Sequence, residues 1–422
     1  MAERTQSITR DRVKTIWREV MVVRILAVSE LYHPYGGAEL ATHLVLKLLK
    51  ANFDITVVTG ATKIERIQDV NYIYCRLLDV PTKIHLWVNL AYLIRSNWFR
   101  RLIERADIIY IPRISYPIIP IAKKYGKKVI VHLHNYQPVN FESMILHPYE
   151  VNSEYNLTKD LKNSLMLEML EYGDLKRALA SSILSPINLF CRLWLAETDT
   201  IICVSRRQAS IVSREMPELA DKIRVIYNPL PDVPLIEKKF PNPPSMLYIG
   251  GDMYTKGFHI FLRASIRLLH TKRNVKFILP GRLGDRCRKL FDTLNRTLSN
   301  SYKVLGYIPR ESLLKLYSES YALLFPSIWE EPLPYAVLES MLAGTIPIAS
   351  RIGGIPEIVE GTPAEKMLFE VGDVNDFVDK IESVLAMSDK QIMDIGFALR
   401  EAVLKKFNHE VAKRNLIKVF SL

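Results

Sequence analysis

Two carboxylates, Glu331 and Glu339, lie eight positions apart in the stretch SIWEEPLPYAVLESMLAGTIPIAS, residues 327–350. Two prolines hold the residues after Glu331 in an extended loop, so the pattern predicts a helix that begins near Tyr335 and places Glu339 about one turn inside it. An ionised carboxylate accepts hydrogen bonds from neutral hydroxyl groups, each worth roughly 1.5 to 3 kcal/mol. The pair therefore indicates a site for a ligand rich in hydroxyl groups. A helix cap at Glu331 and a solvated helix face at Glu339 would explain the same spacing without a ligand.

Glycines and a lysine follow two other apolar runs. Gly36 and Gly37 come after VVRILAVS, where they allow a ligand to approach the backbone at the start of a helix. Lys256 follows SMLYIGG near the start of another helix, where its ammonium group can meet a phosphate. Each feature alone is equally typical of a plain surface turn or of a solvated lysine. Only their combination points to an anionic ligand.

Short apolar runs alternate with amphipathic helical patterns along the chain, which is typical of β-α-β units and parallel sheets. The runs fall into two series, so the sequence predicts two α/β halves with ligands bound beyond the carboxyl ends of the strands. The strands predicted for the first half are Val22–Ser29, Asp54–Gly60, Asp107–Pro112, Lys128–His134 and Thr200–Ser205. Those predicted for the second half are Ser245–Gly251, Val275–Gly281, Tyr321–Ser327 and Thr345–Ser350.

A proline-rich segment separates the two halves. Residues 228–245 contain six prolines, which deny the segment regular structure and suit an interdomain linker. We expect a first domain over residues 1–230, a linker over 231–244 and a second domain over 245–404. A helical insertion without predicted strands occupies about residues 139–186 of the first domain.

The composition favours anionic partners. The 422 residues include 57 Lys and Arg against 45 Asp and Glu, a formal net charge of +12. This charge suits nucleotide phosphates, anionic lipid headgroups or nucleic acid, but no recognition motif supports nucleic acid. Four scattered cysteines form no C-x-x-C pair, which argues against a zinc site or a disulfide framework and suits a reducing compartment.

The sequence predicts no targeting segment. The charged N-terminus lacks the apolar run of a secretory signal. No apolar run approaches the ~20 residues of a membrane span, and charged residues interrupt the nearest, Ile183–Val204. These features predict a cytoplasmic protein that is soluble or attached at a membrane surface.

Residues 326–359 resemble the E-x7-E segment of the family 4 retaining glycosyltransferases, the "glycosyl transferases group 1" domain of the GT-B fold. Four more segments resemble the same family. In the second half, YIGGDMYTKGFHIFLRA resembles the family's strand, loop and Lys-Gly helix start, and KVLGYIPRESLLKLYSESYALLFPS resembles its nucleotide-base strand and following helix. In the first half, HPYGGAEL resembles its N-terminal glycine loop, and VIVHLHNYQP resembles its first-domain histidine segment. The resemblance is specific over residues 245–374, looser over 21–205 and absent from the helical insertion. It implies the GT-B fold, with two Rossmann-like parallel-sheet domains facing each other across a cleft and a C-terminal helix, residues 405–422, that returns to the first domain.

This resemblance implies a site for a nucleotide-diphosphate sugar in the second domain. Glu339 would accept hydrogen bonds from the ribose hydroxyls, and Glu331 would contact the donor sugar near the reacting carbon. Lys256 would neutralise the diphosphate, while Tyr307 and Ile308 would border the base.

By the same resemblance the first domain would complete the donor site. Gly36 and Gly37 would bring backbone N–H groups to the phosphates. His134 matches the family's histidine most closely and would touch the donor sugar or its leaving phosphate. His132 lies two residues earlier and shares the face of the predicted strand, so the two histidines stay alternatives.

Two departures from the family's pattern concern the donor. The family's arginine in the loop before the lysine is missing, because Gly251 stands in its place, and Arg282 at the end of the next strand is the candidate replacement. The family also favours glycine where this chain has Pro334, which has no N–H to offer a sugar. Donor contacts at this point are then expected from the neighbouring residues Pro332, Leu333 and Tyr335, with the N–H coming from Leu333 or Tyr335.

The resemblance implies retaining, metal-independent transfer of a sugar to a glycan or lipid-linked acceptor, with no cofactor. Closure of the domains across the linker would assemble the site and exclude water. Two alternatives stay open. A sugar-nucleotide epimerase or hydrolase of the same fold would need no acceptor, and a catalytically silent sugar-nucleotide-binding protein is favoured by the missing arginine.

One segment suggests an anionic membrane surface as a further partner, at the inner membrane face. Residues 84–105 mix Trp87, Tyr92, Trp98 and Phe99 with four arginines, as interfacial helices do. The apolar positions of the segment equally suit a helix packed on the sheet.

Overall fold

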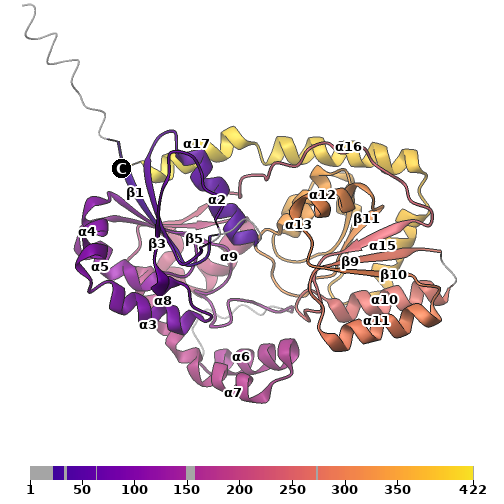
Figure 1. Cartoon of the computed structure of the whole chain (residues 1–422), viewed down its shortest axis with the longest axis horizontal. Helices are drawn as coiled ribbons and strands as arrows, with labels where there is room; N and C mark the ends of the chain where they lie inside the picture. The colour runs from indigo at the N-terminus through magenta and orange to yellow at the C-terminus, as the bar shows by residue number, and fades with distance from the viewer. Residues whose placement is uncertain (1–21, 33–35, 63, 149–156, 272–273, 422) are drawn as a thin grey trace, which may run out of the picture.

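The computed structural model describes residues 22–32, 36–62, 64–148, 157–271 and 274–421. These residues form two α/β domains that lie side by side (Figure 1). Two helices of the insertion project from the first domain, and the C-terminal helices run along the opposite side of the molecule (Figure 1). The expected pair of parallel-sheet domains is confirmed.

The first domain is built on a seven-stranded parallel sheet in the order β3-β2-β1-β4-β5-β6-β7. The sequence analysis missed the edge strands β3 and β7, because both are short and partly exposed and so lack a clear apolar run. The strands are β1 (Arg24–Ser29), β2 (Asp54–Thr59), β3 (Asn71–Tyr74), β4 (Ile108–Ile111), β5 (Lys128–Leu133), β6 (Thr200–Cys203) and β7 (Ile223–Val225).

Helices cover both faces of this sheet, which explains why its central strands are apolar throughout. One face packs against helices that include α3 (Lys83–Leu93), α4 (Asn97–Arg105), α5 (Ile119–Lys124), α8 (Asn188–Ala196) and α9 (Arg206–Glu215). The other face packs against α2 (Gly37–Leu49) and the last helix of the chain, α17 (His409–Phe420).

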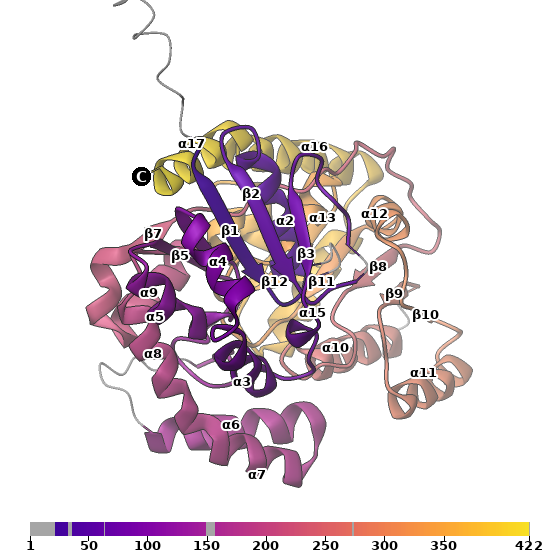
Figure 2. The same cartoon turned by 60° about the vertical axis from the view of Figure 1, so that its left-hand side comes forward.

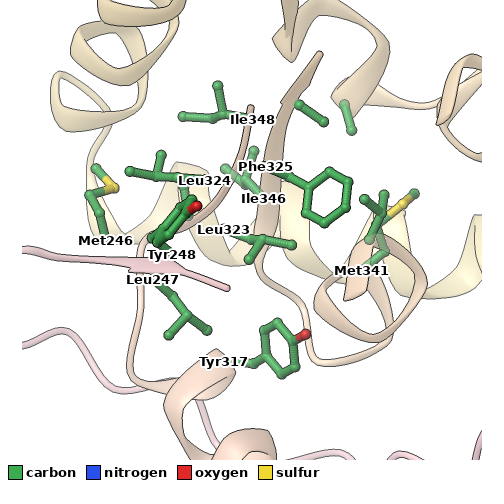
Figure 3. Close-up of a cluster of buried hydrophobic side chains, with 14 of the residues drawn as sticks. Met246, Leu247, Tyr248, Tyr317, Leu323, Leu324, Phe325, Met341, Ile346 and Ile348 are labelled. Atoms are coloured by element: carbon green, nitrogen blue, oxygen red, sulfur yellow. The ribbon is translucent and has the colours of Figure 1, made fainter. Parts of the chain in front are cut away.

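The second domain has a six-stranded parallel sheet in the order β10-β9-β8-β11-β12-β13. Its strands are β8 (Ser245–Tyr248), β9 (Lys276–Pro280), β10 (Tyr302–Gly306), β11 (Ala322–Phe325), β12 (Ile346–Ser350) and β13 (Leu368–Phe369). Side chains of β8, β11 and β12 pack with Tyr317 and Met341 into one apolar cluster (Figure 3). The helices around it are α10 (Phe258–His270), α11 (Asp285–Thr297), α12 (Arg310–Ser318), α13 (Tyr335–Leu342), α14 (Ile355–Val359), α15 (Val374–Leu385) and α16 (Asp389–Lys406).

The chain passes between the domains twice. Residues 226–244 have no regular secondary structure, as their prolines predict. At the C-terminus, Asn408 caps α17 with its side chain after α16 ends, so the segment 405–422 is divided between two helices. Leu416 and Phe420 of α17 are buried in the core of the first domain, which holds the two domains together at a second point.

The insertion contains α6 (Leu157–Tyr172) and α7 (Leu175–Leu184), which pack against each other. In both views they lie on the side of the first domain away from α16 and α17 (Figures 1 and 2). Residues from Leu175 to Ala196 are helical without interruption, with a mean hydropathy of 1.3 over their most apolar window, of which 28% is buried. By length and composition alone this helix could cross a membrane, so the expectation that no segment approaches a span was wrong. The expectation considered Ile183–Val204, which charged residues interrupt, whereas the helix starts earlier, at Leu175, and ends at Ala196.

Residues 84–105 form two helices instead of one. Ser96 precedes α4, and the chain turns between α3 and α4. Trp87 and Phe99 are buried in the core, and the Trp87 indole donates a hydrogen bond to the Ile114 carbonyl. Tyr92 and Trp98 remain exposed, so two of the four aromatic side chains named for this segment face solvent.

Candidate active site

A cleft of about 1240 Å³ lies between the carboxyl ends of the two sheets, lined by both domains. It brings together eleven of the thirteen residues predicted for the site: Gly36, Gly37, His134, Gly251, Lys256, Arg282, Glu331, Pro332, Leu333, Tyr335 and Glu339. Tyr307 and Ile308 are not among the lining residues. They occupy the loop between β10 and α12, and the cleft reaches that region through Arg310 and Leu313.

Glu331 occupies the loop between β11 and α13, where two prolines prevent a helix from starting early. Its side chain is 3% exposed and accepts a hydrogen bond of 2.6 Å from the Lys256 Nζ and one of 2.8 Å from the Ser327 hydroxyl. Such a carboxylate is held in place by two donors. It retains acceptor capacity for a hydroxyl group in the cleft.

Glu339 lies in the second turn of α13, buried at 4% exposure. Its Oε1 forms an ion pair with Arg310, at 2.6 Å from a guanidinium nitrogen. Burial raises the pKa of the Glu339 carboxyl above its usual value, and the Arg310 guanidinium opposes that rise. A carboxylate has about four acceptor positions, so Glu339 keeps capacity for a ligand hydroxyl at the edge of the cleft beside its ion pair with Arg310.

The turn after β8 positions the expected phosphate-binding cation. Gly251 has a φ of 59°, a conformation that side chains disfavour, and a Cβ there would lie 2.9 Å from the Arg282 carbonyl oxygen. The absence of a side chain at Gly251 thus leaves room for the backbone of Arg282, which follows β9 and lines the cleft. Arg282 forms no ion pair with the described residues, so its guanidinium is available to an anion. Asp252 also lines the cleft and accepts a hydrogen bond from the Gly284 N–H.

The N-terminus of α13 opens toward the cleft. Pro334 occupies the N-cap position, and the residues on either side, Leu333 and Tyr335, are buried and line the cleft. The Tyr335 hydroxyl donates to the Pro229 carbonyl in the interdomain segment. The side chain of Tyr335 is thereby occupied, so it can offer the cleft its backbone N–H and the field of the helix N-terminus.

The first domain presents the start of α2 to the same cleft. Gly36 caps the helix and Gly37 begins it. A Cβ at Gly37 would lie 3.8 Å from the Tyr335 ring of the second domain, so the two helix N-termini approach each other closely. Glu39 folds back beside Gly36 and forms an ion pair with Arg113. Residues 33–35 of the predicted glycine loop lie outside the described residues.

The structure distinguishes the two candidate histidines. His134 lines the cleft, whereas His132 is 1% exposed behind it, with its Nδ1 2.9 Å from the Tyr110 hydroxyl. Burial lowers the pKa of His132 to about 3. Burial, helped by His132 and Arg113, lowers the pKa of His134 well below its usual value. His134 is therefore a neutral imidazole at physiological pH, and its Nε2 has no hydrogen-bond partner among the described residues.

The cleft residues that were not predicted include Arg310, Glu171 and Tyr172. Arg310 pairs with Glu339 and lies in the segment that resembles the nucleotide-base strand and following helix, so its position at the start of α12 was a usable signal. Glu171 and Tyr172, at the end of α6, come from the helical insertion, and Glu171 accepts a hydrogen bond of 3.1 Å from the Thr255 N–H. No sequence pattern pointed to these two, because the insertion matched nothing recognisable.

Comparison with known protein families gives two matches that follow one another along the chain. The model described as Glycosyltransferase Family 4 matches residues 35–232, and the model described as Glycosyl transferases group 1 matches residues 235–395. The boundary between them falls in the proline-rich linker.

Curated relatives are distant. An uncharacterized glycosyltransferase of Methanocaldococcus jannaschii is 27% identical over 52% of this chain and 56% of its own length. An uncharacterized 42.6 kDa protein from the cps region of Klebsiella pneumoniae is 22% identical over 90% of this chain and 98% of its own length. The alignment thus spans little more than half of the first relative and nearly all of the second.

Solved structures share the whole architecture. Sucrose-phosphate synthase from Thermosynechococcus elongatus superposes with a TM-score of 0.69 at 18% identity, covering 94% of this chain and 98% of its own. Anabaena HepE in complex with UDP-glucose superposes with a TM-score of 0.62 at 17% identity, with the same coverage. At such identities the likeness establishes the fold.

Proposed function

The chain belongs to the family 4 glycosyltransferases of the GT-B fold, and from this premise we propose that it transfers a sugar from a nucleotide-diphosphate sugar to an acceptor with retention of anomeric configuration. The observation that carries the proposal is the composition of the cleft. His134 from one domain and Glu331, Lys256 and Glu339 from the other line the same space.

The proposed donor lies mainly against the second domain. Glu339 accepts hydrogen bonds from the ribose hydroxyls with the acceptor capacity left beside its ion pair with Arg310, and Lys256 and Arg282 neutralise the diphosphate. The Lys256 ammonium group has three donors, so it can keep its hydrogen bond to Glu331 while it binds a phosphate oxygen. Glu331 then accepts a hydrogen bond from a hydroxyl of the donor sugar.

The chemistry requires stabilisation of a departing nucleoside diphosphate and of an oxocarbenium-like sugar. Fixed cations and the N-termini of α2 and α13 supply positive potential on the diphosphate side. His134 is neutral, so it can donate a hydrogen bond from Nε2 without placing a second positive charge near the sugar. In this proposal no metal ion and no cofactor takes part, because these groups neutralise the leaving group.

The acceptor lies toward the first domain in this proposal. Its cleft residues are mostly small or uncharged, including Gly36, Gly37, Leu40 and Val204, and they leave space next to His134. A glycan or a lipid-linked acceptor can enter there. The neighbour HepE was solved with UDP-glucose, so we choose uridine nucleotide sugars as the first donors to test.

We further propose that the acceptor is lipid-linked and that the protein works at the cytoplasmic face of an anionic membrane. Support comes from an exposed apolar surface on the first domain, here called the apolar face. Trp87 of α3 packs edge-on against Trp194 of α8 at 5.5 Å, which places these two helices together. The apolar face comprises the exposed apolar residues of α3 and of the continuous helix α7–α8: Val88, Tyr92, Leu175, Leu179, Ile183, Leu184, Leu189, Phe190 and Leu193.

Basic side chains accompany the apolar face. Lys176 and Arg177 are exposed at the start of α7, and Arg95, Arg101 and Arg105 are exposed around α4. Exposed apolar side chains bordered by cations are the composition of an interfacial surface, where the apolar groups enter the acyl boundary and the cations meet anionic headgroups.

The function is tested by measuring nucleoside diphosphate release from a panel of nucleotide sugars, with and without candidate acceptors. We expect release that depends on an acceptor, together with a product whose anomeric configuration, read by NMR, equals that of the donor. Conversion of the donor without any acceptor would instead establish an epimerase or hydrolase. Binding in calorimetry without release for any acceptor would establish a silent binding protein, the alternative that the missing arginine favours.

A further inference from the structure

The three residues before Glu331 are held by the opposite domain. Trp329 forms an antiparallel bridge with Leu146, a residue of the first domain. The His147 N–H donates to the Ile328 carbonyl at 2.9 Å, and the Glu330 N–H donates to the Ile145 carbonyl at 2.8 Å. The backbone that leads into Glu331 therefore pairs with the first domain as one strand pairs with another.

The side chains of Ile328 and Trp329 point into different domains, as successive side chains of an extended strand do. Ile328 packs against the core of the second domain. Trp329 is 8% exposed and belongs to the apolar cluster of the first domain, together with Ile145 and Tyr136. A residue of the second domain thus fills a place in the core of the first.

Glu330 carries the polar half of this contact. Glu330 is 2% exposed, and its carboxylate accepts two hydrogen bonds, of 3.0 Å and 2.5 Å, from Arg207 at the start of α9 in the first domain. A carboxylate this deeply buried depends on its partner, because removal of the guanidinium leaves an uncompensated charge. The pair therefore specifies one position of the loop relative to α9.

On its other side, the loop between β11 and α13 packs closely against Gly353 and Gly354. The Gly354 N–H donates to the Glu331 carbonyl at 2.7 Å. Gly353 has a φ of 58°, and a Cβ there would lie 2.1 Å from the same carbonyl oxygen, so only glycine fits. The Glu357 carboxylate next accepts hydrogen bonds from the N–H groups of Arg206 and Arg207 at the start of α9.

We propose that Ile328–Glu330, with its seat at Ile145–His147 and Arg207, is a latch that places Glu331 when the two domains close. The inference rests on the proposed function, since it assigns Trp329, Glu330 and Arg207 as positioning residues for that reaction. When the domains are apart, the loop has lost its partner strand and its ion pair, and Glu331 is held only from its own domain. Closure of the domains on a donor therefore also orients Glu331. When the domains open after transfer, the product is released and Glu331 loses this orientation.

The test is a double-mutant cycle on Arg207 and Glu330 in the full-length protein. We expect Arg207→Met and Glu330→Gln each to lower kcat by about tenfold to a hundredfold, because the reacting groups are misplaced, while affinity for the nucleoside diphosphate changes by less than about threefold. The double variant is expected to be no worse than the poorer single variant. Arg207→Lys, which keeps the charge, should recover part of the loss.

Arg206→Met is the matched control. Arg206 is the preceding residue and also pairs across the domains, with Glu357 and Glu360, but its side chain does not touch the loop. We expect kcat within about twofold of the native protein, as for an exposed pair. An equal loss in Arg206→Met, or losses in Arg207→Met and Glu330→Gln that multiply in the double variant, would overturn the latch in favour of general interdomain adhesion.

A second measurement does not depend on activity. Hydrogen exchange at the His147 and Glu330 amides reports the latch directly, and we expect it to accelerate at least about tenfold in Arg207→Met but not in Arg206→Met. Unchanged exchange at both amides would contradict the latch even if the enzyme is active. If no donor is ever turned over, the proposed function fails while this exchange result still decides whether the latch exists.

Discussion

The two walls of the cleft differ in charge. The wall from the second domain carries six charged side chains, Asp252, Lys256, Arg282, Arg310, Glu331 and Glu339, and two pairs of them are already joined. Among its described residues the wall from the first domain carries one, Glu171, beside glycines, apolar side chains and a neutral histidine. The difference indicates a division of labour, in which one wall binds a charged donor and the other shapes space for an acceptor.

The two domains also differ in what they leave exposed. The second domain packs its helices around one cluster that includes β8, β11 and β12 (Figure 3). The first domain has two clusters, one on each face of its sheet, and adds α6 to α8 with many apolar side chains in solvent. The proposed donor site thus lies on the domain with a single core, opposite the domain that exposes the apolar side chains. The predictions below test this contrast.

The largest expected effect is on Glu331. We expect Glu331→Gln to lower transfer by about a thousandfold, because the substitution removes the charge nearest the reacting carbon in a buried site. The melting temperature should stay close to that of the native protein. Glu360→Gln is the control, since Glu360 is exposed and lies outside the cleft, and it should leave transfer intact. Native turnover in Glu331→Gln would refute the assigned role.

Lys256 should come next. We expect Lys256→Met to reduce kcat/KM by about a hundredfold, because a fixed cation at the diphosphate is lost, and Arg282→Met to reduce it by less. Transfer by the native protein should persist in excess EDTA, as the proposal assigns the diphosphate to these side chains. Steady-state kinetics with and without EDTA test whether a metal ion takes part. Loss of activity in EDTA that is restored by a divalent cation would contradict the assignment of the diphosphate to Lys256 and Arg282.

Glu339 should govern affinity more than turnover. We expect Glu339→Gln to weaken binding of the nucleoside diphosphate by about tenfold to a hundredfold, the value of a hydrogen bond to a charged group. Burial raises the pKa of this carboxyl above the ordinary 4.5, so affinity should be complete above the raised pKa and decline as the pH falls through it, beginning above pH 4.5.

Calorimetry of the native protein and Glu339→Gln over a pH series checks this. The phosphates of the ligand titrate equally in both experiments, so the difference between the two curves isolates the carboxyl. Identical pH profiles for the two proteins would show that Glu339 does not bind the ligand.

The smallest effect concerns the apolar face. Ile183 is 74% exposed on α7, and we expect Ile183→Asp to weaken binding to anionic vesicles by about tenfold, since the side chain no longer enters the acyl boundary. Met393→Asp is the matched control on α16, exposed at 40% and away from the apolar face. Cosedimentation with phosphatidylglycerol vesicles at low salt measures both, and equal binding by the two variants would contradict the assignment.

Local sequence signals predicted many of the residues that line the cleft. Glu331 and Lys256 stand at strand-to-helix turns and Glu339 in the second turn of the helix that follows, where residue type and spacing carry information about a ligand. The edge strands β3 and β7 and the two-residue β13 escaped prediction, because partial exposure and short length remove the apolar run on which such predictions depend.

Other residues of the cleft and of the latch could not be predicted in this way, because they contact residues that are distant in the sequence. Arg207 meets Glu330 across 123 positions, and Glu171 meets Thr255 across 84. The choice between His132 and His134 also required the tertiary structure. The period of a strand places both on one face, and only the position of the cleft separates them.

The central claim is that the cleft binds a nucleotide-diphosphate sugar through the second domain. A crystal structure with the nucleotide sugar that stabilises the protein most in a thermal-shift panel tests it most directly. We predict the ribose hydroxyls within hydrogen-bonding distance of Glu339 and the diphosphate beside Lys256, with Glu331 against the sugar. A ligand bound outside the cleft, or a diphosphate in the cleft that contacts neither Lys256 nor Arg282, would contradict the account.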